Sequence, residues 1–174
     1  MWIIIAFVLA IGLIALAIYG VYQEFGVASN QQTAQGVLTS TSAVIGNVLT
    51  DYAGNPDYSA LTNTTVENDG AVPKNWVVSS NGFSIPGGGT ASFAPASVNG
   101  GTDNGFALTL SNLNKQTCAQ FGTYYTPNTA SVSVNGTVAD NPDYNAGTGT
   151  NWPPALAGDC KTGSNTVIET IAGQ

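Results

Sequence analysis

The sequence predicts an α+β fold in which one long N-terminal helix packs on a small antiparallel sheet. Three observations support this prediction. The first is an uninterrupted apolar run from Trp2 to Val21, and the second is a helical spacing of apolar residues that continues to Tyr52. The third is a series of short runs beyond Pro73 in which apolar and polar residues alternate, a pattern typical of strands.

The apolar run has the length of a membrane-spanning helix. A helix that rises ~1.5 Å per residue crosses a ~30 Å hydrocarbon core in about 20 residues. The first charged residue is Glu24, the chain contains no Arg, and no Lys precedes Lys74, whereas a secretory signal peptide starts with a basic region. We therefore interpret Met1 as the first residue of a processed protein whose basic leader has been removed. Residues 1–26 are expected to form a transmembrane helix.

Two glycines lie near the end of this run: Gly20 within it and Gly26 shortly after it. Gly20 and Gly26 bracket a short segment with a weak apolar pattern. Glycine inside a helix costs about 1 kcal/mol relative to alanine because it has more freedom in the unfolded chain. We expect the helix to be interrupted between about Gly20 and Ser29.

Helical spacing then resumes in an amphipathic segment, 27–54. Gln31, Gln35, Ser42 and Asn47 are expected on its polar face, and Ala53-Gly54-Asn55-Pro56 is expected to end it. The apolar positions recur at intervals of three and four residues: Ala34, Val37, Leu38, Val44, Ile45, Val48, Leu49 and Tyr52. We expect this helix to begin a globular extracellular domain, 27–174.

The remainder of that domain, 55–174, is predicted to contain the sheet and a C-terminal region. One small helix or turn is expected around Tyr58–Leu61, one helical turn over Asn114–Phe121, and a hairpin turn at Asn135-Gly136. The strand-like runs are Trp76–Val78, Phe83–Ile85, Ser92–Phe93, Phe106–Leu110, Val132–Val134 and Val167–Ile171.

Composition excludes several function classes. Only 7% of residues are charged and the net charge is -7, so the chain lacks the Lys and Arg clusters that bind nucleic acid. With no His, the commonest general base is absent, and we expect neither enzymatic activity nor a cofactor. Asp57 and Asp143 could pair as catalytic carboxylates, although turn formation is the commoner role for Asp after Pro. The loops Asp103-Asn104 and 140–143 could hold Ca²⁺, but neither has the spacing of an EF-hand.

The chain contains two cysteines, Cys118 and Cys160. In an exported protein an even number favours a disulfide, which we predict here; two unrelated buried thiols are the alternative. A zinc site is not expected, because there is no His and no second cysteine pair.

These features together resemble the type IV pilins, and more narrowly the type IVb, PilS-like subunits of conjugative (thin) type IV pili. The segment from Leu49 to Asn63 reads LTDYAGNPDYSALTN and is followed by Gly70-Ala71-Val72-Pro73, similar to a passage that follows the helix in this family. The apolar N-terminus and a C-terminal cysteine pair that bounds a loop add to the resemblance.

The resemblance implies a structural subunit that polymerises through its N-terminal helix into an extracellular pilus, used for mating-pair contact or adhesion. It implies an inner-membrane stage before assembly, with the assembly machinery and a prepilin peptidase as partners, and Met1 as the processed and modified residue. A tip adhesin and the recipient cell surface are further partners that it allows. The alternatives are a single-pass anchored extracellular domain and a minor or adhesive pilin that does not form the filament bulk.

One position departs from the family. Type IV pilins carry an acidic fifth residue that pairs with the N-terminal amine of a neighbouring subunit, whereas this chain has Ile5, and no acid precedes Glu24. Starting at Trp2 would place Ala6 there instead. Register between subunits should therefore depend on apolar packing, to which small residues give close approach. The residues expected to pack in the filament core are Ile5, Leu9, Gly12, Ala15 and Leu16.

Overall fold

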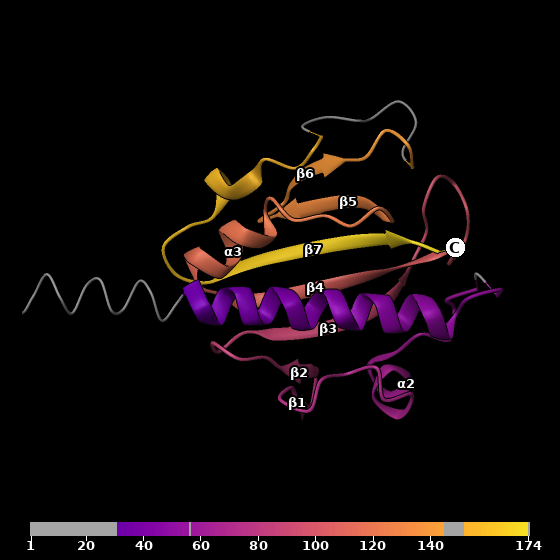
Figure 1. Ribbon diagram of the computed structural model, residues 1–174. Coiled ribbons are helices and arrows are strands. Elements are labelled where there is room, and N and C mark those ends of the chain that lie inside the picture. The colour runs from indigo at the N-terminus through magenta and orange to yellow at the C-terminus, as the bar shows by residue number, and fades with distance from the viewer. Residues whose placement is uncertain (1–30, 56, 145–151, 174) are drawn as a thin grey trace, which may run out of the picture.

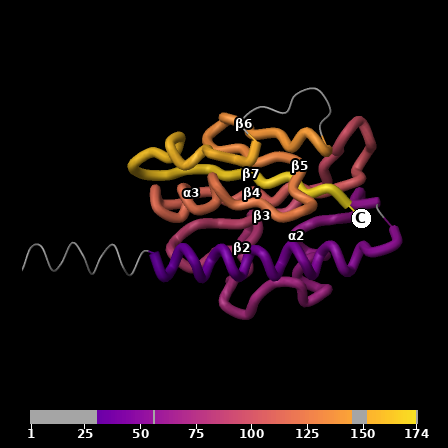
Figure 2. Tube along the Cα trace, turned by 45° about the horizontal axis from the view of Figure 1, so that its top comes forward, coloured from indigo at the N-terminus to yellow at the C-terminus, as the bar shows by residue number. Residues whose placement is uncertain are grey.

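The computed structural model describes residues 31–55, 57–144 and 152–173 of the chain. A helix over 31–51 lies along one face of a seven-stranded antiparallel sheet with the strand order β1-β2-β3-β4-β7-β5-β6 (Figure 1). After the turn in Figure 2, the helix separates from the sheet as a layer of its own. The predicted α+β fold, a long helix on an antiparallel sheet, is therefore confirmed.

Short helices alternate with runs of strands along the chain. The strands are β1 (Val77–Ser79), β2 (Gly82–Ser84), β3 (Thr90–Ala96), β4 (Gly105–Leu113), β5 (Thr129–Val134), β6 (Thr137–Asp140) and β7 (Asn165–Ala172). Three short helices accompany them: α2 (Asn63–Asn68), α3 (Lys115–Phe121) and the 3-10 helix η1 (Leu156–Asp159).

The amphipathic pattern of the helix corresponds to its packing. The apolar positions at three- and four-residue spacing turn toward the sheet, where Ala34, Val37, Val44, Ile45, Val48 and Leu49 are buried. The segment contains several poor helix formers, so this packing, rather than intrinsic propensity, stabilises it. The helix ends at residue 51, and Gly54 follows with a φ of 87°, a left-handed conformation that glycine adopts without strain.

The predicted polar face of the helix needs one correction. Gln31, Gln35 and Asn47 are exposed, but Ser42 is half-buried and its hydroxyl hydrogen-bonds the hydroxyl of Tyr124. The chain after α3 returns to the helix at this point. A contact made by a segment so distant in the chain cannot be read from helical spacing.

Thr41 faces the core beside these residues. It is fully buried, and its hydroxyl has no hydrogen-bond partner among the described residues. A buried hydroxyl without a partner costs about 1–3 kcal/mol. We expect the isosteric change Thr41→Val to raise the free energy of unfolding by about 1 kcal/mol, measured by denaturant unfolding of the full chain in detergent micelles.

Thr39→Val is the matched control for this prediction. Thr39 is exposed on the same helix, and its hydroxyl donates to the Gln35 carbonyl at 3.0 Å, so the change should alter stability by no more than about 0.5 kcal/mol. A loss of stability in Thr41→Val would contradict the prediction.

The sheet has one buried face and one open face. On the helix side, alternate residues of β3, β4, β5 and β7 are large and buried, and they form one hydrophobic core with the helix. Tyr58 closes one end of this core: its ring stacks on Tyr52 with centroids 4.5 Å apart and lies 5.6 Å from the ring of Phe106. This contact ties the end of the helix to β4.

The predicted strands all occur, and so do the helical turn over Asn114–Phe121 and the hairpin turn at Asn135-Gly136. The small element expected around Tyr58–Leu61 is a turn, and α2 begins after it. A capping box fixes that start, because the Thr62 side chain accepts from the Thr65 backbone amide and Thr65 reaches back to the Thr62 amide at 2.7 Å.

Candidate functional site

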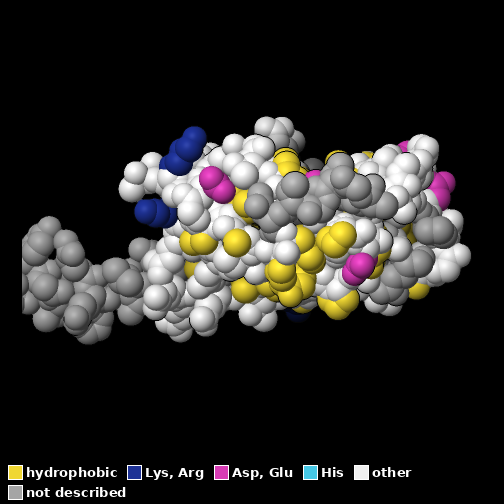
Figure 3. Space-filling view, turned by 90° about the horizontal axis from the view of Figure 1, so that it is seen from above, with side chains coloured by type: hydrophobic (Ala, Val, Ile, Leu, Met, Phe, Trp, Pro, Cys, Tyr) yellow, Lys and Arg dark blue, Asp and Glu magenta, His cyan; other side chains and the backbone are white. Residues whose placement is uncertain are grey.

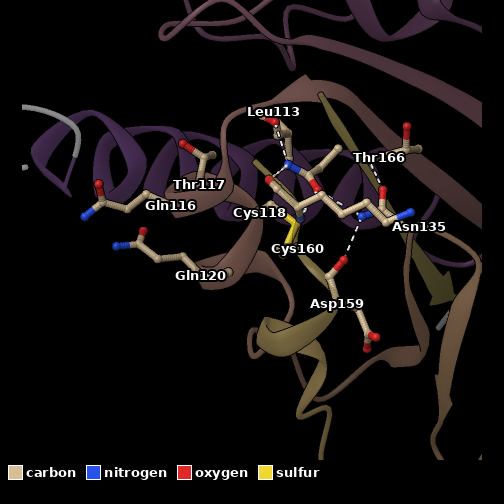
Figure 4. The surroundings of a disulfide bond; sticks show 12 residues. Leu113, Gln116, Thr117, Cys118, Gln120, Asn135, Asp159, Cys160 and Thr166 are labelled. Carbon is tan, nitrogen blue, oxygen red and sulfur yellow. Dashed lines mark hydrogen bonds between the residues drawn. A yellow bond between two sulfur atoms is a disulfide. The ribbon is translucent and has the colours of Figure 1, made fainter. Parts of the chain in front are cut away.

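A disulfide organises the C-terminal half of the molecule. Cys118 lies in α3 and Cys160 directly follows η1; the two are bonded, buried and have Cα atoms 5.9 Å apart (Figure 4). The Asn114 side chain caps α3 by accepting from the backbone amides of Gln116 and Thr117 at 3.0 and 2.9 Å. The bond closes a loop whose described elements include β5, β6 and η1, so it ties η1 to α3.

One buried amide holds the same region together. The Asn165 side chain is 1% exposed, and its nitrogen donates to the carbonyls of Leu113, Lys161 and Gly163 at 3.0, 3.0 and 3.1 Å. Its oxygen accepts from the Lys161 backbone amide at 2.7 Å and from the Asn135 side chain at 2.9 Å. Asn165 therefore joins the end of β4, the loop after the disulfide and the β5–β6 turn.

Asn135 extends this network. It occupies the hairpin turn with a φ of 51°, and its side chain donates to the Asp159 carbonyl at 2.9 Å and accepts from the Thr166 amide at 3.0 Å (Figure 4). The sequence identified Asn135 as a turn residue but gave no sign of the role of Asn165. No local pattern distinguishes an asparagine that merely begins a strand from one that also bridges three segments.

Glu169 is the one strongly perturbed acid among the described residues. It is 3% exposed, lies on the helix-facing side of β7 between Leu108 and Val132, and accepts a hydrogen bond from the Thr129 hydroxyl at 2.8 Å. Burial raises the pKa of Glu169 to about 7, because the charged form loses its hydration. Alternation could have found it, since Glu169 falls between Val167 and Ile171 on the buried face of the predicted strand.

Three other carboxylates act on Tyr52, near the C-terminal end of the helix over 31–51. Burial raises the pKa of Tyr52, and the negative charges of Asp69, Asp51 and Asp57 raise it further, which places all three near this ring. The Asp57 side chain accepts the Ser59 amide at 2.9 Å, a turn-forming bond that lowers the pKa of Asp57. Within 31–55, 57–144 and 152–173, no group of three or more His, Cys, Asp or Glu side chains could hold a metal ion.

The turn that contains Asn141 and Asp143 has its own internal bond. The Asp143 amide donates to the Asn141 side chain at 3.0 Å, and the Asn141 nitrogen donates to the Thr129 carbonyl at 2.9 Å. Asp57 and Asp143 therefore both belong to turns, as the commoner interpretation of Asp after Pro has it.

Exposed aromatic and aliphatic groups mark the disulfide-bounded segment. Tyr125 is 45% exposed, and its ring meets that of Trp152 edge to face at 5.1 Å. Viewed from the side of β6, hydrophobic side chains gather over the middle of the molecule, while Lys side chains lie toward the end at which the described helix begins (Figure 3).

The site residues predicted near the N-terminus lie outside the described residues. These are Met1, Ile5, Leu9, Gly12, Ala15, Leu16, Gly20 and Gly26. In the part of the chain that the structure describes, no helix is both long enough and apolar enough to span a membrane.

Comparison with known proteins gives a consistent result. The family model described as PilS N terminal matches residues 31–172. Over 104 residues the chain is 34% identical to the major structural subunit of the bundle-forming pilus of Escherichia coli O127:H6, a match that covers 59% of this chain and 51% of that subunit. The same subunit of Escherichia coli O111:H- matches with the same identity and coverage. The chain thus spans about half the length of the curated relatives it matches.

The family match covers every described element from the helix to the last strand. The helix packed on an antiparallel sheet and the disulfide-closed loop agree with it. The chain belongs to the PilS N-terminal family of type IV pilins, which are structural and not enzymatic proteins.

Proposed function

We propose that this protein is a pilin that polymerises through its N-terminal helix into an extracellular type IV filament. The observation that carries the proposal is the amphipathic helix over 31–51, which is packed along the sheet and comes after the apolar run Trp2–Val21 in the sequence. A continuous apolar stretch of this kind is soluble in lipid as a monomer and can be buried among identical helices in a bundle.

The proposal includes a division of the chain. Residues 1–26 form the membrane and filament-core helix, and residues 27–174 form the globular domain outside it, with the helix over 27–54 joining the two. The subunit waits in the inner membrane, and assembly machinery and a prepilin peptidase act on it before it joins the filament. Because lipid already solvates the apolar side chains, extraction of a subunit needs an external motor.

Conjugative mating-pair contact or adhesion is the role that we propose for the filament. The PilS family match supports this choice, and the matched relatives are major subunits of a bundle-forming pilus. A minor or adhesive pilin and a single-pass anchored domain are the competing functions. Electron microscopy of sheared surface material separates them, since a major pilin is expected to give abundant filaments and an anchored domain none.

Gly12→Leu tests how the helices pack. With Ile5 in place of the usual acid, close approach of small residues should set the register between neighbouring subunits. We expect Gly12→Leu to abolish sheared filaments while the membrane fraction retains the subunit. Gly12→Ala, which keeps a small side chain, is the matched control and should assemble.

Ile5→Glu supplies the complementary test. A new carboxylate in a dry bundle core costs several kcal/mol unless it finds a partner, so the variant should give no more filaments than the wild type. A clear rise in filaments with Ile5→Glu, or normal filaments with Gly12→Leu, would contradict the packing account of register.

A further inference from the structure

The face of the sheet that points away from the helix is open and almost free of charge. Strand pairing places Ser92, Thr109, Ile168, Ser133 and Val138 in one row across β3, β4, β7, β5 and β6. Directly paired residues of antiparallel strands share a face, and the buried residues alternate with these on the helix side. We call the side of the sheet that carries this row the outer face.

Exposed hydrophobic residues concentrate on the outer face. Five large hydrophobic side chains are exposed among the described residues, and pairing assigns three of them to this face: Val77, Val138 and Ile168. Ile168 is 36% exposed in β7, an interior strand of the sheet, and Val138 is 40% exposed in the edge strand β6. Single exposed apolar residues are ordinary, but here they stand among small uncharged side chains that would not hinder the approach of a second surface.

Charged side chains are nearly absent from the outer face. The net charge is -7, yet Asp140, in the edge strand β6, is the one charged residue that strand pairing places on the outer face of the described sheet. Asp51, Asp57 and Asp69 act on the pKa of Tyr52 at the end of the helix, and strand pairing places none of them in the row. Two copies of so acidic a protein repel each other over most of their surface. A face whose one charge lies on an edge strand is where two copies meet at a low electrostatic cost.

We propose that the outer face docks on the outer face of a second copy of this chain in a neighbouring filament. The inference rests on the proposed function: if the N-terminal helices form the filament core, the helix side of the sheet points inward and the outer face points outward. Small Ser and Thr side chains around Ile168 and Val138 allow two such faces to approach closely.

The dimensions of the face indicate how strong this contact is. Strands about 4.8 Å apart give the five-strand row a width of about 19 Å, and the 9 residues of β4 extend about 30 Å. The projected area is therefore about 570 Å², below the ~800 Å² per partner of a standard stable interface. One pair of subunits should associate weakly, whereas many pairs repeated along two filaments bind by avidity.

The test compares the bundling of filaments assembled from full-length wild type, Ile168→Glu and Val138→Glu. High-speed sedimentation measures all filaments, low-speed sedimentation measures bundles, and electron microscopy distinguishes bundled from single filaments. We expect both variants to give the wild-type yield of filaments and to lower the bundled fraction about tenfold, because like charges then face one another across the contact.

Val78→Glu is the matched control. Val78 is an exposed β-branched residue, 54% exposed, but it pairs with the buried Phe83 and so lies on the helix side of β1. This variant should bundle like the wild type.

The outcomes separate this inference from the proposed function. An absence of wild-type filaments would overturn the proposed function, and single wild-type filaments without bundles would overturn only the docking of outer faces. Unchanged bundling in both outer-face variants, or an equal loss in Val78→Glu, would also overturn it. Variants that stay in the membrane without forming filaments would show that the outer face is buried within one filament, which contradicts contact between filaments.

Discussion

The double change Cys118→Ala and Cys160→Ala is expected to lower the free energy of unfolding by about 4 kcal/mol. The disulfide joins residues 42 positions apart, and closing a loop of this length removes about that much conformational freedom from the unfolded chain. Alanine is chosen because serine would place an unpaired hydroxyl in a buried position. Denaturant unfolding of the full chain in detergent micelles measures the loss.

Wild-type protein under reducing conditions is the control for this prediction. It should unfold at nearly the denaturant concentration of the double variant, and added reductant should leave the variant unchanged. A difference between oxidised wild type and the variant below about 1 kcal/mol would mean that Asn165 and the core hold the enclosed segment without the bond. Such a result would contradict the prediction.

Glu169→Gln is expected to stabilise the protein at neutral and alkaline pH by about 3 kcal/mol. The pKa of Glu169 is raised from 4.5 to about 7, so between these values the folded protein keeps a proton that the unfolded chain has released. Wild-type stability therefore falls as pH rises from 4.5 to 7 and levels off above 7. Glutamine keeps the shape and an oxygen that accepts from the Thr129 hydroxyl, but it never carries the buried charge.

The measurement is the free energy of unfolding of wild type and Glu169→Gln at a series of pH values from 4 to 8. The two should be similar near pH 4 and diverge as pH rises. Glu67→Gln, at an exposed position of α2, removes the same formal charge without changing a buried group and should run parallel to the wild type. Parallel curves for Glu169→Gln and wild type would show that Glu169 does not titrate in this window.

Local patterns were sufficient to predict most elements of this fold. The three- and four-residue spacing from Ala34 to Tyr52 predicted the helix, and alternation in Phe106–Leu110 and Val167–Ile171 predicted two strands that the structure pairs directly. Both patterns can be recognised from residues that are close together in the sequence: one or two helical turns for the helix, and a few alternating positions for each strand. The disulfide was equally accessible because the chain has only two cysteines to join.

The interactions that the sequence did not predict are those between distant segments. Ser42 and Tyr124 are 82 residues apart, and Asn165 bonds a carbonyl 52 residues away, so no periodicity links them. The strand order has the same cause: β7 lies between β4 and β5, although β5 and β6 precede it in the chain. Pairing of this kind is decided by how the whole sheet packs under the helix.

The position of β7 has a consequence for synthesis and export. It is the last described element, yet it lies between β4 and β5 and joins the two parts of the sheet. A chain that emerges N-terminus first can pair β1 to β4 and β5 with β6, but these two parts share no strand ladder until residues up to Ala172 have arrived. The helix at the start of the domain must wait for the strand at its end before its apolar face is fully covered. A chain that stalls in a ribosome or translocon before β7 has emerged therefore has a sheet divided into two parts. The sheet can be completed only after residues up to Ala172 have emerged.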